Sequence, residues 1–336
     1  MKIGIILHPY GEDKPAGLGR FIFELTKAML EADSRNQYII FLKKDLKILP
    51  QFPGTNWKAE VLGGGRAKLG GGRFWLENLR RKEQADIYIF NTPVMPLFYK
   101  PKKSVVIAFD FAYKHLMTRN FKEWLTAKIL SWYHGFSLKK ANVIVATSEQ
   151  TKRDIVKFFK IPENKIQVIA TGFNKICDII PRALDVSKPY FLFTGVVKQR
   201  KNVLNLVKGF ADFIEKHPGY HLVIAGNAEG EYADEVRQYI KTRELGGQVL
   251  FLGYVKDEQL SFLYKNALAF TFPSFIEGFI GLPILEAMDC GLPIIASNTA
   301  PLVDVGGKNS AIFVDPNDPK AIARALEKIA FDENLR

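Results

Sequence analysis

Two glutamates flank a predicted helix start in a stretch that is rich in glycine and proline. Glu277 precedes the helix, Pro283 suits its first turn, and Glu286 follows one turn later. The free N–H groups of a helix N-terminus bind phosphate, and carboxylates accept hydrogen bonds from sugar hydroxyls. Glutamates near a helix start also occur as plain capping or solvent-facing residues. The stretch therefore suits a ligand with both phosphate and hydroxyl groups, with simple capping as the alternative.

Two cations stand before another predicted helix in the second half of the chain. Arg200 and Lys201 follow a buried strand over residues 190–194 and Gly195, and Gly226 follows the next strand. In an open α/β sheet, ligands bind beyond the carboxyl ends of the strands. Cations and helix N–H groups at that edge can neutralise a diphosphate, whereas the alternative is a solvated helix start.

Strands alternate with helices in both halves of the chain. This order predicts an α/β protein with two doubly wound, Rossmann-like parallel-sheet domains that face each other across a cleft. The periodicity lapses over residues 172–189, so we place the domains at residues 1–180 and 181–336. In the first domain, strands are expected at residues 2–7, 38–42, 85–91, 104–109, 143–146 and 166–169.

Positive charge is concentrated in the first half. Residues 1–180 contain 30 Lys and Arg against 16 Asp and Glu, whereas residues 181–336 contain 17 against 19. Nucleic acid and an anionic lipid surface both fit a basic half, as does a merely solvated surface. Residues 63–73 add two glycine triplets with three cations, which predicts an exposed loop that either clamps an anionic partner or is a tolerated insertion.

Residues 114–140 combine cations with tryptophan and other apolar side chains. The pattern fits a helix lying in a membrane interface, or a core helix whose aromatic side chains face the sheet. No apolar run has the length of a membrane span. Cys177 and Cys290 are far apart in the sequence, which argues against a disulfide framework and for a reducing compartment. We therefore expect a cytoplasmic location, including the inner face of the membrane.

The order and spacing of these motifs resemble the retaining glycosyltransferases of family 4, which have the GT-B fold. The resemblance covers nearly the whole chain and is densest in the second half. It is carried there by residues 194–202, 253–255, 260–264, 272–279, 282–288, 296–298 and 314–316. In the first half it is carried by residues 17–20, 147–149 and 165–169.

The resemblance implies a role for each candidate site residue. Arg200 and Lys201 would bind the donor diphosphate, Glu277 the hydroxyls of the donor sugar, and Glu286 the ribose. The remaining implied contacts to the nucleotide sugar come from Gly17, Gly195, Gly226, Gly278, Phe279, Gly281 and Leu282, with Asp110 near the reacting sugar.

The implied reaction moves a sugar from a nucleotide diphosphate sugar to a hydroxyl, with retained anomeric configuration. The acceptor would be a glycan, a glycolipid or a lipid-linked sugar in cell-surface polysaccharide synthesis. The resemblance implies no metal and no cofactor besides the nucleotide sugar as co-substrate. It also favours an anionic membrane surface, and not nucleic acid, as the partner of the basic domain.

The chain departs from the family pattern at several positions. Eight residues separate Glu277 from Glu286, one more than usual, and Ile280 is the apparent insertion. Phe109 precedes Asp110 where histidine is common. The chain stops at Arg336, short of the final helix that usually crosses back to the first domain.

Two other functions remain as alternatives. The inserted residue and the short C-terminus fit a non-catalytic protein that binds a nucleotide sugar or a polyanion. A nicotinamide-dependent dehydrogenase fits less well, because Lys43 and Lys44 follow the second strand where an acidic residue is expected.

Overall fold

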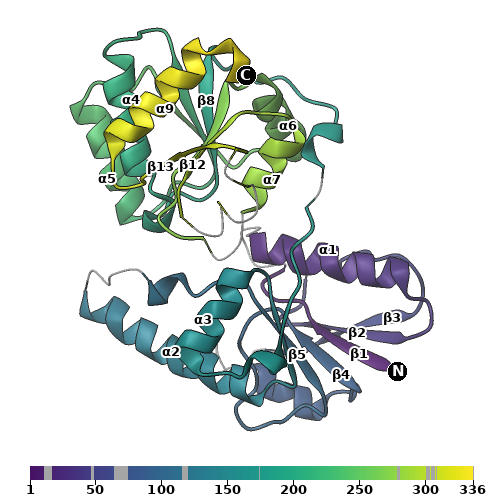
Figure 1. The fold of residues 1–336 in the computed structure, drawn as a ribbon. Helices are drawn as coiled ribbons and strands as arrows, with labels where there is room; N and C mark the ends of the chain where they lie inside the picture. The colour runs from purple at the N-terminus through teal and green to yellow at the C-terminus, as the bar shows by residue number, and fades with distance from the viewer. Residues whose placement is uncertain are drawn as a thin grey trace. The chain divides into compact units, whose positions relative to one another are not determined.

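The computed structural model describes residues 1–10, 17–46, 49–63, 75–115, 120–173, 175–277, 281–299, 303, 307 and 309–335. The chain divides into two compact units, and each contains a parallel sheet with helices packed on it (Figure 1). Unit 1 comprises Met1–Phe109 and Met117–Ala170, and unit 2 comprises Asp110–Leu116 and Thr171–Arg336. The predicted fold class, with two Rossmann-like parallel-sheet domains, is confirmed.

The sheet of unit 1 has seven parallel strands in the order β3-β2-β1-β4-β5-β6-β7. Its strands are β1 (Lys2–Ile6), β2 (Gln37–Leu42), β3 (Trp57–Val61), β4 (Ile87–Phe90), β5 (Ser104–Ala108), β6 (Val143–Ala146) and β7 (Ile166–Val168). The edge strand β3 was not predicted, because its sequence mixes charged with apolar residues. Its side chains are only partly buried, as befits an edge.

The α-helices among the described residues of unit 1 are α1 (Gly17–Ala32), α2 (Phe121–Lys140) and α3 (Glu149–Phe159). The Ser148 hydroxyl caps α3 by accepting a hydrogen bond from the Thr151 N–H. A short 3-10 helix, η1 (Trp75–Arg81), precedes β4 and buries Trp75. Among the described residues, no helix is long and apolar enough to cross a membrane.

The two tryptophans of α2 do not cover the sheet. Trp124 is 45% exposed and Trp132 is 62% exposed, whereas the buried residues of α2 are His134, Ser137 and Leu138. The interpretation of α2 as a core helix with inward-facing aromatic side chains is therefore wrong. The buried residues of the helix all lie in its C-terminal half.

The sheet of unit 2 has six parallel strands in the order β10-β9-β8-β11-β12-β13. They are β8 (Tyr190–Thr194), β9 (His221–Ala225), β10 (Val249–Gly253), β11 (Ala269–Phe272), β12 (Ile294–Ser297) and β13 (Ile312–Val314). Its helices include α4 (Val203–Ile214), α5 (Glu231–Thr242), α6 (Asp257–Asn266), α7 (Leu282–Asp289) and α9 (Pro319–Phe331). The central strands β8 and β11 are fully buried, which explains their nearly continuous apolar sequences.

The two cysteines are joined in a disulfide. Cys177 lies in a short 3-10 segment (Ile176–Asp178), Cys290 follows α7, and their Cα atoms are 5.4 Å apart. The expectation against a disulfide is therefore wrong. Their separation of 113 residues along the chain carries no information about their distance in space.

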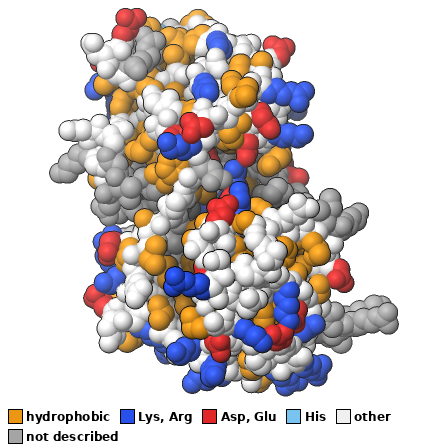
Figure 2. Space-filling model, turned by 90° about the vertical axis from the view of Figure 1, so that its right-hand side faces the viewer, with side chains coloured by type: hydrophobic (Ala, Val, Ile, Leu, Met, Phe, Trp, Pro, Cys, Tyr) orange, Lys and Arg blue, Asp and Glu red, His pale blue; other side chains and the backbone are white. Residues whose placement is uncertain are grey.

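Basic side chains are dispersed on the face that Figure 2 shows. Lysine and arginine side chains occur there on both units, and acidic and apolar side chains lie among them. The net positive charge of the first half therefore does not form a single patch on this face.

Candidate functional site

Two glycine turns meet at the carboxyl ends of β8 and β9. Gly195 follows β8 with φ of +135°, and Gly226 follows β9 with φ of +141°. A Cβ atom on Gly226 would lie 2.2 Å from the Gly195 carbonyl oxygen, so only glycine allows this approach. The Val197 N–H donates to the Asn227 carbonyl at 2.8 Å and holds the two loops together.

Asn202 fixes the segment that carries the two cations. This segment is a short 3-10 turn, Gln199–Lys201, and Asn202 ends it in the left-handed region with φ of +58°. The Asn202 Nδ2 atom donates to the Pro273 carbonyl at 2.9 Å and to the Pro316 carbonyl at 2.6 Å. Asn202 thereby ties the cationic turn to the loop that follows β11.

Arg200, Lys201 and Glu277 form a buried ion cluster. Arg200 Nη1 lies 2.9 Å from Glu277 Oε2, and Lys201 Nζ lies 2.6 Å from Glu277 Oε1. The Glu277 side chain is only 3% exposed. Lys201 Nζ also lies 4.2 Å from the ring centroid of Phe272. The structure therefore unites residues that the sequence placed in separate motifs, and the three side chains retain one net positive charge when Lys201 is protonated.

Burial changes the acid–base properties of these cations. Burial, together with the Arg200 charge, lowers the pKa of Lys201 from 10.5 to about 8, although Glu277 opposes the shift. Burial would also lower the pKa of Arg200, but the negative charges of Glu277 and Asp110 raise it above its usual value. Arg200 is thus a permanent charge, whereas Lys201 loses its charge at mildly alkaline pH.

Glu286 is held by a tyrosine that the sequence analysis did not assign to the site. The buried Tyr264 hydroxyl donates to Glu286 Oε2 at 3.0 Å and lies 2.8 Å from Thr194 Oγ1. Thr194 is the last residue of β8, directly before Gly195. Tyr264 therefore connects the glycine turn to the carboxylate on α7. Tyr264 belongs to residues 260–264, which carry part of the family resemblance, but the sequence analysis gave this tyrosine no role of its own.

The remaining predicted site residues occupy several places. Gly281, with φ of +85°, caps the N-terminus of α7, and Leu282 is the first residue of that helix. Gly17 begins α1 in unit 1. Asp110 Oδ1 accepts a hydrogen bond from the Ala112 N–H at 3.2 Å. Three residues between the glutamates, Gly278, Phe279 and Ile280, lie outside the described residues, as does most of the 63–73 loop.

Metal ligands do not cluster in the part of the chain that the structure describes. No group of three or more His, Cys, Asp and Glu side chains there could hold a metal ion.

Comparison with known proteins identifies both halves of the chain. A family model described as Glycosyltransferase Family 4 matches residues 15–175, and one described as Glycosyl transferases group 1 matches residues 178–336. O-antigen chain mannosyltransferase B from Escherichia coli is 34% identical over 212 residues, which cover 60% of this chain and 54% of that protein. The chain thus spans about half the length of this relative.

Solved structures share the fold over nearly the whole chain. Sucrose-phosphate synthase from Thermosynechococcus elongatus superposes with a TM-score of 0.76 and 20% identity, covering 98% of this chain and 90% of that one. HepE from Anabaena, in complex with UDP and glucose, has a TM-score of 0.73 and 17% identity, covering 99% and 91%. Both likenesses show the fold, and the two family models together match nearly all residues. The chain is a GT-B fold member of the family 4 glycosyltransferases.

Proposed function

We propose that the protein is a retaining glycosyltransferase that uses a nucleotide diphosphate sugar. The observation that carries this proposal is the buried cluster of Arg200, Lys201 and Glu277 beside the glycine turns after β8 and β9. It offers cations for a diphosphate and a carboxylate for sugar hydroxyls. The relatives with O-antigen functions support an acceptor in cell-surface polysaccharide synthesis, either a glycan or a lipid-linked sugar.

In the proposed reaction, the bond between the anomeric carbon and the diphosphate oxygen breaks. Negative charge then develops on the leaving diphosphate, and Arg200 and Lys201 stabilise it in a site of low polarity. The acceptor hydroxyl oxygen bonds to the anomeric carbon on the face that the diphosphate leaves, and its proton passes to an oxygen of the leaving diphosphate. We propose that these cations serve without a metal or a resident cofactor.

Glu277 has a second task in this arrangement. Each of its carboxylate oxygens is paired with one cation, yet a carboxylate can accept further hydrogen bonds. A sugar hydroxyl that donates to Glu277 would therefore be positioned next to the cations that bind its diphosphate. Glu286, oriented by Tyr264, would accept a hydrogen bond from the ribose.

The same observation supports one alternative. Glu277 is almost fully buried and both its oxygens are ion-paired, which also fits a carboxylate that only organises the cations. The protein would then bind a nucleotide sugar or another polyanion without transfer.

We further propose that unit 1 contacts an anionic membrane surface at the inner face of the membrane. Apolar side chains on α2 are exposed at Phe121, Trp124, Leu125, Ile129 and Trp132. Lysines on the same helix, at positions 122, 128 and 139, are exposed as well. Apolar insertion and attraction between lysines and anionic lipid are the two terms that hold such helices at an interface.

A thermal-shift screen with UDP-, GDP- and ADP-sugars tests the proposed donor site. A true donor stabilises the folded chain by about 2.7 kcal/mol at a concentration of 100 times its Kd. We expect stabilisation by one nucleotide class and loss of that stabilisation when Arg200 is replaced by Met. Absence of stabilisation by the entire panel would contradict a nucleotide-sugar site.

A further inference from the structure

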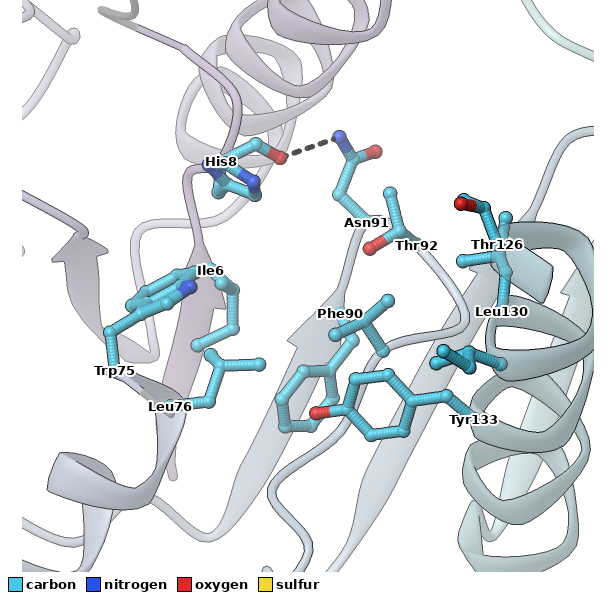
Figure 3. A pocket seen from close by; sticks show the side chains of 12 residues that line it. Ile6, His8, Trp75, Leu76, Phe90, Asn91, Thr92, Thr126, Leu130 and Tyr133 are labelled. Atoms are coloured by element: carbon cyan, nitrogen blue, oxygen red, sulfur yellow. Dashed lines mark hydrogen bonds between the residues drawn. The ribbon is translucent and has the colours of Figure 1, made fainter. Parts of the chain in front are cut away.

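Unit 1 contains a pocket that no predicted site residue touches. It measures about 200 Å³ and lies beyond the carboxyl ends of β1 and β4, between η1 and α2 (Figure 3). Ligands of open α/β sheets bind at this end of the strands. The location is therefore that of a ligand site rather than of a packing defect in the core.

The walls of the pocket are chiefly apolar and aromatic. Figure 3 shows side chains from three directions around the same space: the strand ends, η1 and α2. None of the described lining residues is Asp, Glu, Lys or Arg. The apolar and aromatic part of the lining comprises Ile6, Trp75, Leu76, Phe90, Val94, Ile129, Leu130 and Tyr133. Such a lining disfavours a phosphate or a free sugar and favours an alkyl or isoprenyl group.

The polar groups of the wall are few and mostly engaged. The Tyr133 hydroxyl donates to the Met95 carbonyl at 2.8 Å, and the Thr126 hydroxyl donates to the Lys122 carbonyl at 2.8 Å. Asn91 Nδ2 donates to the His8 carbonyl at 3.1 Å. The Asn91 Oδ1 atom is buried and has no hydrogen-bond partner, so the lining is chiefly apolar with one amide oxygen left to accept a hydrogen bond.

The pocket adjoins the exposed apolar face of α2. Ile129 lines the pocket and is also 43% exposed, so the pocket wall continues into the surface that carries Trp124, Leu125 and Trp132. Lys128, next to Ile129, provides a positive charge at this boundary. An amphipathic molecule with an apolar chain and an anionic head matches both parts: the chain fits the pocket, and the head lies near the lysine.

We propose that this pocket binds the apolar chain of a lipid-linked acceptor. This assignment to an acceptor rests on the transferase function proposed above, whereas the binding of an alkyl chain can be measured without any transfer. The apolar chain would lie in the pocket, and the anionic head with its sugar would lie at the boundary with the exposed face of α2, near Lys128.

Fluorine NMR with 5-fluorotryptophan tests the proposal, because the four tryptophans report on different surfaces. Trp75 lines the pocket, Trp124 and Trp132 report on the exposed face of α2, and Trp57 lies in β3. The probes are octyl glucoside, below its micelle concentration, and methyl glucoside. We expect octyl glucoside to shift the Trp75 resonance saturably and methyl glucoside to leave it in place.

Two matched threonine substitutions separate the pocket from the surface. Thr126→Phe places a ring in the pocket and should weaken octyl glucoside binding at least about tenfold, because the buried alkyl contacts are lost. Thr242→Phe on α5 is the control, since Thr242 is an exposed helical threonine that also donates to a carbonyl four residues earlier. The control variant should bind like the wild type.

Other outcomes would overturn the proposal. If octyl glucoside shifts the resonances of Trp124 and Trp132 but not that of Trp75, its alkyl chain covers only the surface of α2. An equal response to both glucosides, or full binding by Thr126→Phe, would show that the pocket takes no alkyl chain. If Trp75 responds as expected while no nucleotide sugar stabilises the protein, the pocket stands and the proposed transferase function fails.

Discussion

Lys201 Nζ lies 2.6 Å from Glu277 Oε1 in a site where the Glu277 side chain is only 3% exposed. A buried charge pair of this kind costs desolvation, and its retention beside the glycine turns fits a ligand-binding role. Arg200 shares the same carboxylate at 2.9 Å. The surplus positive charge is what a diphosphate would neutralise.

We expect binding of the nucleoside diphosphate to take up protons at about pH 8 and above. Burial lowers the pKa of Lys201 to about 8, and a bound diphosphate would raise that pKa again by adding negative charge nearby. Up to about one proton should therefore enter the complex per ligand, and affinity should fall as pH rises above 8. Calorimetry in buffers of different ionisation enthalpy measures this uptake.

Lys201→Met should abolish the proton uptake, whereas Lys216→Met, at an exposed lysine, should leave it unchanged. The same pKa shift also affects folding. The folded state binds fewer protons than the unfolded state between about pH 8 and 10.5, so this group makes stability rise with pH in that window. Proton uptake that persists in Lys201→Met would assign the effect to another group.

Tyr264→Phe should weaken nucleotide binding about fivefold to tenfold. The substitution removes the hydroxyl that orients Glu286 and contacts Thr194, a loss of about 1–1.5 kcal/mol. Titration of the nucleoside diphosphate, together with denaturant unfolding, measures both affinity and stability.

Tyr190→Phe is the matched control for that prediction. Tyr190 is equally buried, and its hydroxyl donates to the Leu263 carbonyl at 2.9 Å, away from Glu286. Both variants should lose similar stability, but only Tyr264→Phe should lose affinity. Equal nucleotide affinities in the two variants would show that Tyr264 contributes to the core only and not to nucleotide binding.

Gly226→Ala should destabilise unit 2 by about 3 kcal/mol and abolish nucleotide binding. The added Cβ would lie 2.2 Å from the Gly195 carbonyl oxygen, and φ of +141° strains any residue other than glycine. Gly246→Ala is the control, because no atom lies within 4 Å of its added Cβ. Thermal unfolding of both variants is the measurement, and similar melting temperatures would argue against contact between the two turns.

Trp132→Ala should weaken binding to anionic vesicles about fivefold to tenfold, because it removes a large exposed apolar side chain from α2. Binding of the wild type should also fall steeply as salt is added. Tyr254→Ala, at a 70% exposed aromatic residue of unit 2, should bind like the wild type. Cosedimentation provides the comparison, and salt-insensitive binding would remove the electrostatic part of the proposal.

Local patterns predicted much of the fold. The clearest patterns were a continuous apolar run, as in the buried strand β8, and a capping residue before a helix, as with Asp318 before α9. The edge strand β3 was missed because half-buried strands with charged residues lack a clear apolar pattern. The exposed aromatic face of α2 was undecided, since a sequence cannot show what a helix packs against.

The sequence predicted individual residues of the candidate site but not how they contact one another. The motifs supplied Arg200, Lys201 and Glu277, but only the structure showed that one carboxylate pairs with both cations. The contact between Tyr264 and Glu286 was not predicted and the disulfide was wrongly excluded, because both join segments far apart in the chain. Long-range contacts leave no local pattern in a single sequence.

Sugar transfer by the Glu277→Gln variant tests the central claim most directly. Glutamine keeps the shape of the side chain but removes the negative charge that pairs with Arg200 and Lys201. It also replaces one of the two carboxylate oxygens that can accept hydrogen bonds from sugar hydroxyls. With the nucleotide sugar that stabilises the wild type, we expect transfer or hydrolysis to fall at least about a hundredfold. Nucleoside diphosphate binding should remain or become tighter, because the two cations lose their counter-ion. Wild-type turnover by Glu277→Gln, or no turnover by the wild type itself, would contradict the proposed enzyme.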